Sequence, residues 1–117
     1  MAHQSELHAR IGAMWDLYKK CLPDVGNAYD ALPMAVYKDG ALPGKMKRLM
    51  ALTGALVHGC RACVLFQTDH ALAEGADVAE ILEACAVAVS LGGTMGGGET
   101  TRVVEYLDEK GLLGDFK

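Results

Sequence analysis

The segment 81–91 is apolar almost without interruption, with Glu83 and Ser90 as its only polar residues. Asp77 and Glu80 precede it with the spacing of a capping box, which predicts that a helix begins here. A helix that is apolar on nearly every side must also be covered on nearly every side. A chain of 117 residues buries only about two-thirds of its unfolded surface. The segment therefore predicts self-association; the alternative is that the first two helices wrap it.

The rest of the chain carries the apolar spacing and the end signals of further helices. Ser5 is a candidate N-cap of the first helix, Pro33 is expected to kink or split the second, and Gly75 closes the fourth. No stretch has a convincing strand pattern, and aromatic residues make up only 6% of the chain, which favours helix packing over a β-sandwich. The predicted fold is a single all-α domain over residues 1–117 with about six helices. Besides the segment above, these cover residues 5–20, 24–37, 44–58, 60–74 and 99–110.

Composition excludes several classes of partner. A formal net charge of −4 argues against a nucleic-acid surface, which needs a concentrated positive field to displace counterions. No apolar run reaches the roughly 18 residues needed to cross a bilayer, and residues 1–6 lack the features of a signal peptide. We therefore expect a cytoplasmic protein with no nucleic-acid or membrane partner. In that setting cysteines serve as thiols, ligands or redox centres more often than as structural disulfides.

Cys60 and Cys63 are the residues with the clearest chemical meaning. At i and i+3 in the first turn of a predicted helix they share one face, which allows a reversible disulfide, and the helix start stabilises a thiolate. Residues 41–68 contain no Asp or Glu, while four cations fall in the same stretch: Lys45, Lys47, Arg48 and Arg61. The alternative is that the cations form a solvated turn and both cysteines fill the core. We interpret Cys85 as a core residue and Cys21 as incidental.

A metal site is a second interpretation of the same region. His58, Cys60, Cys63 and His70 are four plausible zinc ligands, in the order His-x-Cys-x-x-Cys with a second histidine further on. A helix that continues after Cys63 carries His70 away from the cysteine pair. We therefore predict a protein without a metal and without a cofactor.

Several ordered motifs follow one another in the stretch 45–98: Cys-x-x-Cys, then Ala-Leu-Ala-Glu-Gly-Ala at 71–76, Glu-Ile-Leu-Glu at 80–83 and Gly-Gly at 92–93. In this core the chain resembles the carboxymuconolactone decarboxylase family, and within it the small proteins similar to alkylhydroperoxidase D. The resemblance implies an alkylhydroperoxidase D-like all-α fold, assembled as a homotrimer or homohexamer. It also implies a peroxide or disulfide substrate and a dithiol electron donor.

The same resemblance implies roles for the two cysteines, in which Cys63 attacks the peroxide to form a sulfenic acid and Cys60 resolves it as a disulfide. The redox branch of the family places a Glu twelve residues before the first cysteine and a His four after the second, where this chain has Arg48 and Gln67. Gln67 can hydrogen-bond a sulfur or a peroxide oxygen but cannot shuttle a proton. Arg48 can stabilise a thiolate by its charge but is not a general base.

His70 is a candidate for a displaced substitute of the missing histidine, on the same helix face as Cys63 but about 10.5 Å further along the axis, too far for direct contact with Cys63. His58, at the end of the third predicted helix, is another, although its direction is not fixed by the sequence. The predicted function is a thiol–disulfide redox protein with weak hydroperoxide reductase activity, and the candidate catalytic residues are Cys60, Cys63, Gln67 and His70. The alternative is a non-catalytic oligomeric binding or scaffold protein that has lost the proton relay. No residue argues for a decarboxylase that acts on a lactone.

Overall fold

The computed structural model describes residues 2–117, and within them every regular element is a helix. The all-α prediction is confirmed. Five α-helices and a short terminal 3-10 helix, Gly114–Phe116, make up the fold. The α-helices are α1 (His3–Cys21), α2 (Pro23–Val36), α3 (Gly44–His58), α4 (Arg61–Ala73) and α5 (Val78–Glu109).

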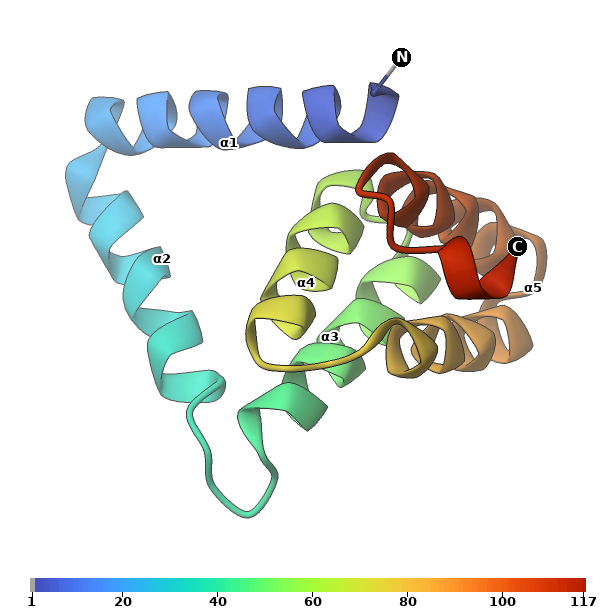
Figure 1. The fold of residues 1–117 in the computed structure, drawn as a ribbon. Helices are drawn as coiled ribbons and strands as arrows, with labels where there is room; N and C mark the ends of the chain where they lie inside the picture. Colours follow the sequence, from blue (N-terminus) through green and yellow to red (C-terminus); the bar gives the residue numbers. More distant parts are fainter. Residues whose placement is uncertain (1) are drawn as a thin grey trace.

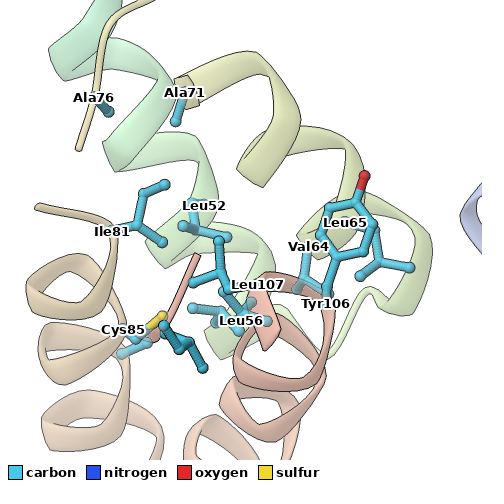
Figure 2. Close-up of a cluster of buried hydrophobic side chains, with 13 residues drawn as sticks. Leu52, Leu56, Val64, Leu65, Ala71, Ala76, Ile81, Cys85, Tyr106 and Leu107 are labelled. Carbon is cyan, nitrogen blue, oxygen red and sulfur yellow. The ribbon is translucent and has the colours of Figure 1, made fainter. Parts of the chain in front are cut away.

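Helices α3, α4 and α5 pack against one another and form the body of the molecule, while α1 and α2 make an angled arm along two of its sides (Figure 1). The start of α1 contacts α4 and α5, whereas α2 packs mainly on α1 and contacts α3 at its last residue, where Lys47 Nζ donates to the Val36 carbonyl oxygen at 2.9 Å. Figure 2 shows the core between α3, α4 and α5, with Leu52, Leu56 and Leu107 at its centre. Each of these three side chains is fully buried. The arm contributes no fully buried side chain to this cluster.

Helix α5 turns back on itself at Gly93, whose φ of 56° and ψ of −131° are not helical. Its two segments, 78–92 and 94–109, correspond to the two helices predicted at 81–91 and 99–110, although the second begins earlier than predicted. Gly96 allows the tight reversal, because a Cβ atom there would collide with the carbonyl oxygen of Ala88. As one continuous helix, α5 would be long and apolar enough to cross a membrane. Neither segment reaches the roughly 20 residues that a span needs.

The apolar first segment of α5 is only partly covered in the single chain. Its buried residues are Ile81, Cys85 and Ala88, while Val87 is 51% exposed and Leu91 is 71% exposed. The arm does not cover them, because α2 makes no contact with α5 and α1 contacts it elsewhere. The alternative in which the first two helices wrap this segment is therefore wrong.

The helix-end residues predicted from the sequence are only partly found at helix ends in the structure. The capping box is present, with Glu80 N donating to Asp77 Oδ1 at 2.8 Å and Asp77 N donating to Glu80 Oε1 at 3.0 Å. The Ser5 N-cap prediction is wrong, because α1 begins at His3 and the Ser5 amide instead donates to Glu109 at 2.8 Å. A carboxylate from the far end of the chain thus satisfies the first amides of α1. Pro33 lies inside α2, which continues through it.

Asp69 attaches the arm to the body. It accepts hydrogen bonds of 2.8 Å from the hydroxyl of Tyr106 at both carboxylate oxygens, and His8 Nε2 of α1 lies 3.1 Å from it. The His8 ring also stacks on Phe66, with centroids 4.2 Å apart. These contacts join α1 and α5 to α4, the helix that begins at the cysteine pair.

Removing the Tyr106 hydroxyl tests the α4–α5 part of this junction, because its hydrogen bonds join Tyr106 of α5 to Asp69 of α4. Tyr106 is 3% exposed, and hydrogen bonds to a charged group contribute about 1.5 to 3 kcal/mol each. We expect Tyr106→Phe to lower the free energy of unfolding by about that amount, measured by urea denaturation followed by circular dichroism. Tyr29→Phe is the matched control, because Tyr29 is 55% exposed. A loss no larger than the control's would contradict the role of Asp69.

Candidate functional site

The cysteine pair lies where the chain passes from α3 into α4. Gly59 ends α3 in the left-handed conformation with φ of 82°, a backbone geometry that favours glycine. Cys60 follows as the N-cap of α4, and its Sγ accepts a hydrogen bond from the Cys63 amide at 3.3 Å. The two sulfurs are joined as a disulfide, with Cα atoms 5.2 Å apart. The predicted placement of both thiols at a helix start is confirmed.

The two sulfurs differ in their surroundings. Cys63 is exposed, whereas Cys60 is half-buried and is the sulfur that receives the helix amide. After reduction, that amide and the positive end of the helix dipole stabilise a thiolate on Cys60. A sulfur stabilised in this way is also a good leaving group when a donor thiol attacks its partner. Cys63 is therefore the sulfur that is accessible to solvent, and Cys60 is the sulfur whose thiolate the helix start stabilises.

The other two cysteines lie outside the site. Cys85 is a core residue, 2% exposed, and burial raises the pKa of its thiol to about 11. It is therefore protonated and unreactive at neutral pH. Cys21 is free and exposed at the end of α1.

One face of α4 carries all the predicted site residues that follow the motif. Cys63, Gln67, His70 and Glu74 are spaced by four, three and four residues, which places them on a single side of the helix. The buried residues of α4 point the other way and include Val64, Leu65, Thr68 and Ala71. We call the set Cys63, Gln67, His70 and Glu74 the α4 site face.

Arg48 reaches the α4 site face from α3. Its Nη1 donates to Gln67 Oε1 at 3.2 Å, and its guanidinium carbon lies 3.6 Å from the centre of the Tyr37 ring. Gln67 is thus engaged by the arginine rather than by a sulfur. Arg48 Nε is buried and has no hydrogen-bond partner among the described residues. Sequence reasoning missed Tyr37, because a cation–π pair between residues eleven positions apart leaves no periodic signal.

Neither histidine considered from the sequence hydrogen-bonds a cysteine within residues 2–117. His58 is exposed at the last position of α3. His70 is two turns along α4 from Cys63, and Gln67 lies between them. Burial lowers the pKa of His70 from its ordinary value of 6.5, and the charge of Arg48 lowers it further, against an opposing effect of Asp69. The catalytic roles of Gln67 and His70 remain predictions.

The His70 titration is a direct check on this arrangement. A lowered pKa means that a smaller share of the His70 imidazole is protonated at pH 7 than in an ordinary histidine. We expect an NMR titration of His70 to show this shift, and Arg48→Met to move the pKa upward by removing a nearby positive charge. A pKa at or above the ordinary value, or one insensitive to Arg48→Met, would contradict the placement of Arg48 beside this face.

The zinc interpretation finds no support. No group of three or more His, Cys, Asp or Glu side chains within residues 2–117 is arranged to hold a metal ion, and the two candidate thiolates are bonded to each other. A zinc site needs deprotonated thiols and four converging ligands.

Comparison with known proteins decides the family. The sequence profile of the carboxymuconolactone decarboxylase family matches residues 23–105, which include α2 to α4, the cysteine pair and most of α5. The chain belongs to the carboxymuconolactone decarboxylase family. The resemblance inferred from the motifs is thereby confirmed.

Relatives and solved structures agree with the family. The chain is 30% identical to an uncharacterized protein of Cupriavidus necator over 104 residues, 89% of this chain and 88% of the relative. A family member from Legionella pneumophila, solved in its apo form, superposes with a TM-score of 0.85 at 27% identity, covering 93% of this chain and 97% of that one. A Thermotoga maritima member, for which an antioxidative role has been suggested, superposes with a TM-score of 0.73 at 29% identity, covering 90% and 92%.

Proposed function

We propose that this family member is a thiol–disulfide oxidoreductase that reduces hydroperoxides through Cys60 and Cys63, with electrons from a dithiol. The observation that carries the proposal is the difference between the two cysteines at the start of α4. Cys63 is exposed, whereas the half-buried Cys60 accepts a hydrogen bond at its sulfur from the Cys63 amide. The antioxidative role suggested for the similar Thermotoga maritima protein supports it.

The proposed reaction has three steps. The Cys63 thiolate attacks the outer oxygen of a hydroperoxide; the O–O bond breaks, the alcohol leaves after taking a proton from solvent, and Cys63 becomes a sulfenic acid. The Cys60 thiolate then attacks the Cys63 sulfur, which forms the disulfide and releases the hydroxyl as water. A dithiol reduces the disulfide by attack at Cys63, with Cys60 as the leaving thiolate. The second thiol of the donor then attacks the donor sulfur of the resulting mixed disulfide, which releases the Cys63 thiolate and closes the donor into a cyclic disulfide. The net reaction converts one hydroperoxide and one dithiol into an alcohol, water and a cyclic disulfide.

Proton transfer is the weak part of this site. Gln67 is hydrogen-bonded to Arg48 and has no titratable group. The two residues of the α4 site face that can act as a base, His70 and Glu74, lie about two and three helical turns from Cys63. General acid–base catalysis contributes typically about 10²- to 10⁴-fold to a rate. We therefore propose a turnover limited by solvent as the proton donor and acceptor, which is a weak activity.

Self-association and location complete the proposal. The solvent-exposed apolar side chains of α2 and of the first segment of α5 support assembly with further copies of the chain. The proposed form is a homotrimer or homohexamer. A reducing compartment, the cytoplasm, would keep the pair reduced between turnovers.

A coupled assay tests the activity. The reduced protein is mixed with cumene hydroperoxide and dithiothreitol, and hydroperoxide loss is followed over time. The proposal predicts catalytic consumption well above that of dithiothreitol alone, with saturation in hydroperoxide. Consumption equal to that of dithiothreitol alone would overturn the activity.

A non-catalytic scaffold is the second candidate, favoured by the replacement of both family relay positions by Arg48 and Gln67. The two candidates differ in thiol reactivity. An oxidoreductase has a thiolate that is alkylated by iodoacetamide below the pH at which a model peptide thiol reacts. A scaffold gives an alkylation profile against pH that matches the model peptide.

A further inference from the structure

Arg48 is a cation with no partner of opposite charge. No carboxylate in residues 2–117 lies within ion-pair distance of it, and its buried Nε makes no hydrogen bond. Its two contacts, the Gln67 amide oxygen and the face of the Tyr37 ring, are both neutral. A half-buried guanidinium without a counter-charge retains the capacity to bind an anion in a bidentate manner.

A hollow opens beside this guanidinium. It has a volume of about 310 Å³ and is lined by Pro33, Met34, Tyr37, Lys38, Arg48 and Glu74. Its walls combine apolar groups from the end of α2 with two cations. The one acid, Glu74, has a carboxylate oxygen 3.3 Å from the position that a Cβ atom of Gly44 would take, so this carboxylate lies at the start of α3. Such a lining suits a molecule with a carboxylate and an aliphatic part.

The hollow and Cys63 are linked through the α4 site face and through Arg48. Glu74 lines the hollow and ends this face, Gln67 in its middle is bonded to Arg48, and Cys63 begins it. One helical turn, about 6 Å of rise, separates Cys63 from Gln67. A molecule whose anionic group contacts Arg48 can therefore extend along α4 and present its other end to the exposed Cys63.

We propose that Arg48 and the hollow beside it bind the carboxylate of the substrate, so that the hydroperoxide reduced at Cys63 is one carried by an aliphatic carboxylic acid. This inference rests on the proposed function for the reaction, but the anion site itself does not. Arg48 is then a specificity-determining residue, and Tyr37 positions its guanidinium by stacking. The charge at this position selects an acid over its neutral ester.

Binding to the oxidised protein tests the anion site without any redox chemistry. Octanoate and octan-1-ol are titrated into the disulfide form, and amide shifts are followed by NMR. We expect octanoate to bind at least about tenfold more tightly, with an affinity that falls as salt is added. Arg48→Met should abolish the preference, Arg48→Lys should retain part of it, and Lys20→Met, at an exposed cation of α1, should leave it unchanged.

The result that overturns the inference is a wild-type protein that binds the two ligands equally, or an Arg48→Met variant that keeps the preference. If Arg48→Met does not fold, the comparison of octanoate with octan-1-ol on the wild type, together with Arg48→Lys, decides the question. Cysteine-dependent turnover of a medium-chain fatty acid hydroperoxide is then compared with that of its methyl ester. A preference in binding with no turnover of either compound supports the anion site and rejects the redox function. Turnover of both without a preference in binding supports the redox function and rejects the anion site.

Discussion

Cys63→Ser is expected to reduce hydroperoxide consumption to the rate of the dithiol alone, while Cys21→Ser consumes hydroperoxide like the wild type. Cys63 provides the exposed sulfur of the pair, Cys60 is half-buried, and Cys85 is buried with the pKa of its thiol raised to about 11. Cys21 is the matched control, since it is free and exposed but lies at the end of α1. The measurement is the initial rate in the dithiothreitol-coupled assay.

Cys60→Ser separates the two chemical roles. Without a resolving thiol, Cys63 should be oxidised once and stay a sulfenic acid, which dimedone labels and mass spectrometry locates. The opposite pattern, with a dimedone adduct on Cys60 in Cys63→Ser and none on Cys63 in Cys60→Ser, would show that the roles are reversed. Full activity of Cys63→Ser would remove the pair from the mechanism altogether.

Leu91→Glu is expected to break the proposed homo-oligomer into single chains. Leu91 is 71% exposed on the apolar segment of α5, and burying such a side chain contributes about 1.5 to 3 kcal/mol in each copy of a symmetric interface. The substitution removes that contribution and places an unpaired charge where water is to be excluded, at a further cost of several kcal/mol. Sedimentation velocity measures the outcome directly.

Lys117→Glu controls for added negative charge. Lys117 is exposed and its ion pair with Asp108 is of the surface kind that contributes little. This variant should sediment as the wild-type oligomer does. A wild type that sediments as a single chain at micromolar concentration would contradict the assembly, and the bare apolar surface of α5 would then need another partner.

Sequence reasoning succeeded where the determining interactions are local. The end of α3 at His58, predicted in the range 44–58, depends on residues a few positions apart. The same holds for the capping box of Asp77 and Glu80 and for the cysteine pair at the start of α4. The failures are long-range. The Ser5 cap was wrong because Glu109, from the other end of the chain, satisfies the amides of α1.

The candidate site shows the same limit. Cys60 and Cys63 could be found from their spacing, and the helical period placed Gln67 and His70 on one face with Cys63. The contact of Arg48 with Tyr37 and Gln67 depends on how α2, α3 and α4 meet in space, which no local pattern encodes. The reversal of α5 could be suspected from its glycines, but its position at Gly93 follows from the packing of Gly96 against Ala88.

The redox role of the pair is tested most directly by the product of a single oxidation. Fully reduced wild-type protein is mixed with one equivalent of hydroperoxide, the remaining thiols are alkylated, and the peptides are analysed by mass spectrometry. We expect rapid formation of a Cys60–Cys63 disulfide, with Cys21 and Cys85 recovered as alkylated thiols. Recovery of Cys60 and Cys63 as alkylated thiols, or their oxidation no faster than that of a free model dithiol, would contradict it.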